Sequence, residues 1–166
     1  AWLDAQGHSE AAARARRHGE ATLLGTEREL PGPVGERNLY MLHPKGRVLL
    51  LPATKAGLIE QIAAVLASGN SATVEGMALP RDLPASVAKH LAQRSDEPFA
   101  AALVEGDGTA ILAAQQRLAA MPGPIVPLHA ARADLPLAYA PEWLVEEVVV
   151  SINTTAAGGN ASLMMI

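Results

Sequence analysis

The sequence predicts an α/β fold in which a parallel sheet carries helices on both faces. Residues 47–53 form a short aliphatic run bounded by Gly46 and Pro52, which is typical of a strand buried on both faces. Strand-like and helix-like runs then alternate as far as residue 131. Parallel neighbours need a crossover, and the crossover is usually a helix. We therefore expect a degenerate Rossmann-like domain over residues 44–141.

The N-terminal 43 residues predict a helix and a connector. Residues 1–21 are rich in Ala, Glu and Arg, so we expect a helix from the opening residues. No convincing N-cap precedes it, and we expect the chain to be a piece of a longer protein. Prolines and glycines in residues 31–46 favour a turn, with a short extended piece from Asn38 to Leu42.

The repeating units of the core are bounded by recognisable caps. Thr54 can cap a helix with apolar residues at helical spacing, and Gly69 supplies a left-handed stop. Asp107 is a natural N-cap in the turn between a strand and a helix. We expect strands at 71–76, within 99–106 and at 124–130, and helices at 84–94 and 109–121.

The last part of the chain, residues 142–166, predicts a C-terminal β-flap and a tail. Residues 132–143 are loop-like, and residues 144–153 have the β-branched content of an exposed strand. The final run is uncharged, with paired glycines and an apolar end, so it must either fray or dock. Docking explains its composition better, since small residues permit close backbone approach while Leu163 and Met164 can fill an apolar pocket.

Composition excludes several classes of function. The chain has 166 residues, of which 49% are hydrophobic and 18% charged, and its formal net charge is −4. An acidic balance argues against a nucleic-acid partner, because phosphate recognition needs clustered Lys and Arg. The absence of cysteine removes disulfides and thiol nucleophiles. With no apolar stretch long enough to cross a bilayer and no evident signal peptide, we expect no membrane association and a cytoplasmic location.

The motifs of common catalytic sites are missing. The five histidines lie far apart, outside any pattern that would place two imidazoles on one helical face, so no metal site is expected. No serine elbow and no phosphate-binding loop are present. After the first buried strand the chain reads Leu-Pro-Ala-Thr-Lys-Ala-Gly, without the glycines that let backbone amides meet a pyrophosphate.

Several segments resemble known proteins. PKGRVLLLPA, AAVLASGNSATVEG and FAAALVEGD are similar, in order and spacing, to the cofactor-binding half of the aldehyde dehydrogenase superfamily. PGPVGERNLYMLHPKGRVL, GPIVPL and the ending VSINTTAAGGNASLMMI resemble the C-terminal region of proline utilization A, a bifunctional enzyme that oxidises proline to glutamate. The resemblance implies FAD and NAD for the longer enzyme.

Departures from the superfamily pattern predict that this segment binds no cofactor. Pro52 is followed by Ala53, Thr54 and Lys55, so the expected substrate-side asparagine is gone, and no cysteine can attack an aldehyde. The lysine expected to hold the adenosine ribose falls on Glu75. Carboxylates in Val104-Glu105-Gly106-Asp107 would repel a pyrophosphate.

The resemblance implies a non-catalytic domain whose flap and tail dock on an aldehyde dehydrogenase domain of the same polypeptide or of a second subunit, helping to cover a substrate-channelling cavity. We expect docking through Asn153, Thr154, Thr155, Gly158, Gly159, Asn160, Leu163 and Met164. Two alternatives are a nucleotide-binding domain that uses Lys55 and Arg47 as phosphate partners, and an oligomerisation module whose flap pairs across subunits.

Overall fold

The computed structural model describes residues 1–153, so the docking residues expected from Thr154 to Met164 lie outside the described part of the chain. Its body is a five-stranded sheet in the order β5-β4-β3-β6-β7. All four neighbouring pairs are parallel, which confirms the predicted α/β class. The strands are β3 (Arg47–Leu51), β4 (Ser71–Val74), β5 (Leu91–Ala92), β6 (Ala101–Val104) and β7 (Leu128–Ala130).

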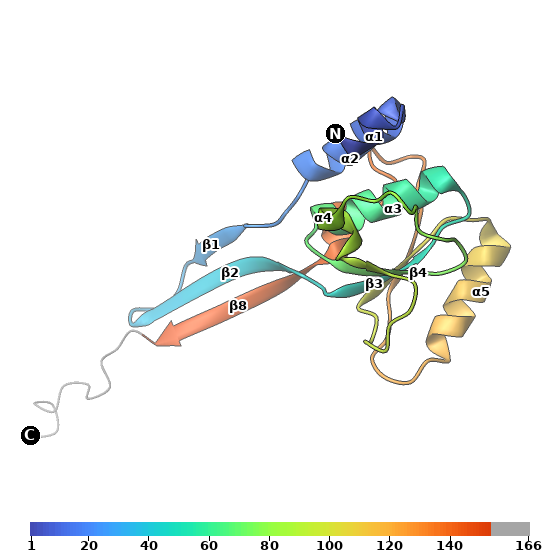
Figure 1. Ribbon diagram of the computed structural model, residues 1–166. Coiled ribbons are helices and arrows are strands. Elements are labelled where there is room, and N and C mark those ends of the chain that lie inside the picture. Colours follow the sequence, from blue (N-terminus) through green and yellow to red (C-terminus); the bar gives the residue numbers. More distant parts are fainter. Residues whose placement is uncertain (154–166) are drawn as a thin grey trace, which may run out of the picture.

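Helices cover both faces of this sheet (Figure 1). Helix α3 (Lys55–Ala67) joins β3 to β4, whereas α5 (Gly108–Ala119) joins β6 to β7 on the other side of the strand order. Right-handed crossovers that run in opposite directions place their helices on opposite faces. The sheet is therefore doubly wound, and its order reverses between β3 and β6.

The core follows the alternation of side chains along the central strand. On one face, Val48 and Leu50 pack in a cluster with Leu58 and Val65 of α3. On the other face, Leu49 packs in a smaller cluster with Leu118 of α5. Because Val48, Leu49 and Leu50 are fully buried, a continuous aliphatic run is what this position requires.

The predicted helix caps are confirmed. The Thr54 hydroxyl accepts a hydrogen bond from the Gly57 amide at 2.9 Å, and Asp107 accepts one from the Ala110 amide at 2.9 Å. Gly69, just past the end of α3, has φ of 72°, the left-handed conformation that favours glycine.

The N-terminal helix prediction was wrong in one respect, because the segment forms two helices rather than one. Helix α1 (Trp2–Ala5) ends at a turn in which Gly7 has φ of 77°, and α2 (Ser9–Glu20) begins after it. A residue in that conformation cannot continue an α-helix. Helix α2 then packs on α3, so the N-terminal pair lies outside the helix layer (Figure 1).

The helix expected over residues 84–94 was also wrong. Only α4 (Ala85–Ala88) is helical, and Leu91 and Ala92 instead pair with Ala72 and Thr73 of β4. The Ala72 amide donates to the His90 carbonyl at 2.8 Å. Strand pairing with the sheet has overridden local helix propensity here.

A three-stranded antiparallel sheet in the order β1-β2-β8 projects from the body; we call it the flap (Figure 1). It consists of β1 (Glu27–Leu30), β2 (Glu36–Pro44) and β8 (Val145–Asn153), the last preceded by the 3₁₀ helix η1 (Pro141–Leu144). Strand β8 confirms the predicted C-terminal strand. The extended piece expected from Asn38 to Leu42 was too short, and β1 was not predicted, so two flap strands come from residues 27–44.

Within residues 1–153, no helix has the length and apolar content required to cross a bilayer.

Candidate cofactor crevice and docking flap

The carboxyl ends of β3 and β6 meet where the strand order reverses, the position at which open α/β sheets usually bind ligands. Strand β3 ends at Leu51 and β6 ends at Val104. Beside this point lies a cavity of about 320 Å³ whose lining includes Gly57, Glu105 and Tyr139. The cavity therefore lies at the usual ligand position of this fold.

The side chain of Glu105 lies at the carboxyl ends of β3 and β6 and binds the turn that follows β3. One carboxylate oxygen, Oε2, accepts hydrogen bonds from the Ala53 and Thr54 amides, each at 2.8 Å. The other, Oε1, accepts a bond from the Thr54 hydroxyl at 2.8 Å. A carboxylate thus sits at the N-terminus of α3, where backbone amides and the helix dipole favour an anion.

Gly57 makes room for that carboxylate. A Cβ atom built on Gly57 would lie 1.8 Å from Oε2 of Glu105, closer than any non-bonded contact allows. The Thr54 hydroxyl meanwhile donates to Glu105 and accepts from the Gly57 amide, so both of its roles are filled. The turn, the glycine and the glutamate therefore form one fitted unit.

Glu75, the residue at the expected ribose position, is engaged as well. Its carboxylate forms an ion pair of 2.6 Å with the Arg117 guanidinium, which reaches over from α5. Both side chains are partly exposed, so this pair contributes little to stability. The Glu75 carboxylate, which follows the end of β4, is therefore already paired with a cation of the same chain.

The two cations considered as phosphate partners do not come together. Arg47 is the first residue of β3 and pairs with Glu97, whereas Lys55 follows the other end of that strand. The strand alone separates them by roughly 13 Å, from its rise per residue. A single phosphate group cannot bridge that distance, so the structure does not bring Lys55 and Arg47 into one site.

The flap presents apolar side chains away from the body. Val149, Val150 and Ile152 of β8 and Leu30 of β1 are all exposed. In the described part of the chain β8 pairs with β2 alone, so its outer side is a sheet edge. Protruding, apolar edges are pairing or docking surfaces in proteins. Asn153 is the one expected docking residue within the described part of the chain, and it is the last residue of β8.

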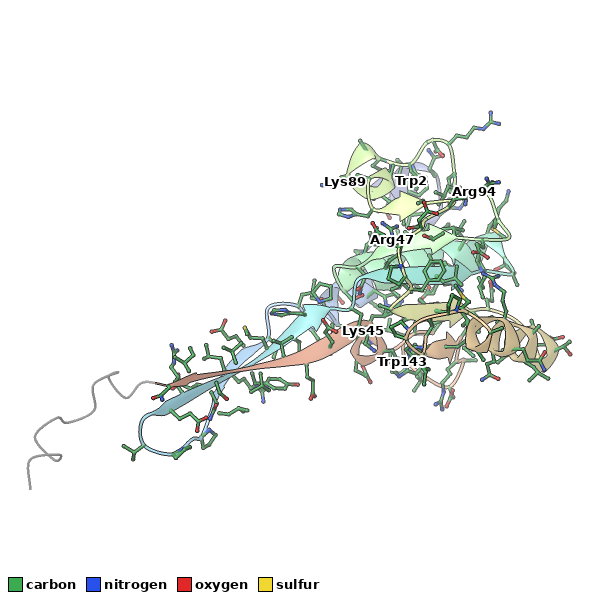
Figure 2. All side chains as sticks on the ribbon, turned by 90° about the horizontal axis from the view of Figure 1, so that it is seen from below. Trp2, Lys45, Arg47, Lys89, Arg94 and Trp143 are labelled. Atoms are coloured by element: carbon green, nitrogen blue, oxygen red, sulfur yellow. The ribbon has the colours of Figure 1, made fainter. Side chains whose placement is uncertain are left out.

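Asn70 fixes the base of the flap, which sequence reasoning missed. Its side-chain oxygen accepts from the Gly46 amide at 2.7 Å, and its side-chain nitrogen donates to the Leu144 carbonyl at 2.8 Å. These contacts hold the ends of β2 and β8 nearest the body. Trp143 packs nearby with its ring stacked on His129, at a centroid distance of 4.8 Å, and Figure 2 places Lys45 and Trp143 at this base.

Together these features define a class of protein: a doubly wound α/β domain whose ligand crevice is filled by its own side chain and which carries a projecting β-flap. Sequence comparison places the chain more narrowly. It is 49% identical over 99% of its length to the bifunctional protein PutA of Rhizobium meliloti, of which it spans 14%. The chain is therefore homologous to one segment of proline utilization A, PutA.

Solved structures share the fold of this chain. Proline utilization A from Corynebacterium freiburgense superposes with a TM-score of 0.56 at 17% identity, covering 92% of this chain and 14% of that one. A mutant of the Bradyrhizobium japonicum protein superposes with a TM-score of 0.51 at 26% identity, covering 73% and 14%. No family model matches the chain. The chain thus spans about one seventh of the relatives that it matches.

Proposed function

We propose that this chain is a non-catalytic domain of a longer, bifunctional enzyme that converts proline to glutamate. In this proposal the FAD and NAD sites lie in other parts of that polypeptide. The flap and the tail dock on its aldehyde dehydrogenase domain, or on that of a second subunit. By docking they help to cover the cavity through which the intermediate passes between active sites.

The flap is the observation that carries this proposal. It projects from the body, exposes Val149, Val150 and Ile152, and ends at Asn153, where the expected docking tail begins. An edge strand this long and apolar is normally covered by a partner, because bare edges aggregate. The relatives are several times longer than this chain, which supports a partner within the same polypeptide.

The crevice supports the non-catalytic part of the proposal. Glu105 fills the anion position of α3, and Glu75 is paired with Arg117. The chain also has no cysteine with which to attack an aldehyde. What remains is a packed α/β body that holds the flap at a fixed place, which is the task of a scaffold.

The test places charges on the flap of the longer enzyme. Val150→Lys and Ile152→Lys are expected to weaken docking by about tenfold or more, since each would bring an unpaired charge into an apolar contact. The coupled conversion of proline to glutamate should then slow, while proline oxidation measured alone stays unchanged.

Leu112→Lys is the matched control, because Leu112 is 54% exposed on α5, away from the flap. It should leave both rates unchanged. A coupled rate that is insensitive to the two flap lysines, or as sensitive to the α5 lysine, would refute docking through the flap.

A further inference from the structure

The hydrogen bonds of Glu105 resemble those that a bound phosphate would make. Three donors converge on one carboxylate: the amides of Ala53 and Thr54 and the hydroxyl of Thr54, all at 2.8 Å. In nucleotide-binding proteins such a set of donors at a helix N-terminus receives a phosphate from the ligand. Here Glu105, the residue that follows the adjacent strand β6, supplies the anion.

We propose that Glu105 is a built-in replacement for a phosphate ligand: its carboxylate completes the turn between β3 and α3 and excludes phosphate-bearing molecules from it. This inference rests on the proposal that the crevice holds no cofactor, and it assigns the exclusion to one residue. Asp107 has a different task, because its carboxylate caps α5.

Two independent observations support the assignment. The first is Gly57, where a side chain would collide with both carboxylate oxygens, at 1.8 and 2.7 Å. Backbone without a Cβ is what close approach of an anion to a helix requires. The second is the adjoining cavity of about 320 Å³, whose wall includes Glu105, Arg14 and Arg132. Space for the rest of a phosphate ester thus remains beside the occupied position.

The replacement also explains how the body keeps its form without a ligand. Glu105 directly follows β6 and its partners follow β3, so the contact ties together the ends of two strands at the point where the sheet order reverses. Its amide donates to the Leu51 carbonyl at 3.0 Å, which aligns the same two strands. A domain built in this way stays ordered at every concentration of nucleotide, as a scaffold should.

The experiment removes the carboxylate and offers inorganic phosphate to the chain. In Glu105→Ala and Glu105→Ser the side chain is too short to reach the amides, so the position is vacated. We expect phosphate to raise the thermal midpoint of both variants by about 2–4 °C relative to chloride at matched ionic strength. Wild-type protein should show only the smaller, general stabilisation that phosphate gives to folded proteins relative to chloride.

Two further variants separate charge from occupancy. Glu105→Gln keeps an oxygen in the position, so it should show little response to phosphate. Glu142→Ala removes an exposed carboxylate on the 3₁₀ helix, outside the crevice lining, and should behave as wild type.

Several results would overturn the inference. These are a phosphate response of wild-type protein equal to that of the alanine variant, no response in folded alanine and serine variants, or failure of both to fold even in phosphate. None of these results bears on the flap, whose test is the coupled rate of the longer enzyme. The two proposals therefore fail separately.

Discussion

Glu60 joins the N-terminal helices to the body through a largely buried polar contact. Its carboxylate lies 2.7 Å from Nε2 of His18 and accepts from Nε of Arg14 at 2.9 Å. Burial raises the pKa of Glu60, but the hydrogen bonds and charges of His18 and Arg14 outweigh it, so the pKa is lowered from its ordinary 4.5. The ionised form is therefore favoured by folding.

The lowered pKa of Glu60 predicts that the free energy of unfolding depends on pH. A carboxyl whose pKa is lower in the folded state contributes stability above its ordinary pKa and loses it as pH falls through the folded value. Glu60→Gln should cost about 1–3 kcal/mol of unfolding free energy at pH 7. The difference from wild type, measured by urea unfolding, should shrink below about pH 4.5. A difference that is constant down to pH 3 would refute the role of ionisation.

The roles of single residues differ in how well the sequence predicts them. Thr54 and Asp107 act on amides three residues away, so their capping roles follow from local chemistry. Glu105 reaches Ala53, 52 residues away along the chain. The sequence indicated carboxylates near a pyrophosphate position, but that one of them binds the helix end depends on β3 and β6 being neighbours.

Asn70 acts at the scale of elements, because it sets how the flap leaves the body. Its side chain is almost fully buried and contacts the backbone at Gly46, before β3, and at Leu144, before β8. Such contacts fix the direction of two strands at once. The Asn70 side chain therefore helps to set the orientation of the flap relative to the sheet, together with the backbone bond from the Lys45 amide to the Leu144 carbonyl.

Asn70→Ala should leave the Gly46 amide without its partner, at a cost of about 1–3 kcal/mol in unfolding free energy. The Leu144 carbonyl would keep only the longer bond from the Lys45 amide, at 3.5 Å. Asn70→Asp is the matched variant, because its oxygen still accepts from Gly46 but cannot donate to Leu144. Amide hydrogen exchange should quicken in β2 and β8 for both variants. Faster exchange that spreads evenly over the five-stranded sheet instead would contradict a local role.

Elements were predictable where local pattern and tertiary role agree. Strand β3 and helix α3 have an aliphatic run, a cap and a stop, and all were found as expected. Strand β5 was missed because its two residues, Leu91 and Ala92, follow a helix-like run and gain their form only by pairing with β4. Strand β1 reads Glu-Arg-Glu-Leu, whose four residues are all exposed, so no apolar alternation marks it.

At the scale of the whole molecule, the flap projects from the five-stranded body, and the proposal assigns docking to the flap and support of the flap to the body. The central strands of the body are buried on both faces, while the flap exposes apolar side chains beyond it (Figure 1). Charges are sparse along the outer half of β8, where residues 148–153 carry none. A surface of that kind is stable only when it is covered.

The tail that follows the flap gives the last prediction, which concerns the longer enzyme. Removing residues 153–166 should slow the coupled conversion of proline to glutamate, since an uncovered cavity lets the intermediate escape before it reaches the second active site. Proline oxidation measured with an artificial electron acceptor should be unchanged, because the catalytic sites themselves are proposed to lie elsewhere. The control removes residues 160–166 alone, which keeps Asn153, Thr154 and both glycines and should give a smaller loss. An equal loss of both steps would instead identify a general folding defect, and retention of the full coupled rate would exclude the tail from the cover.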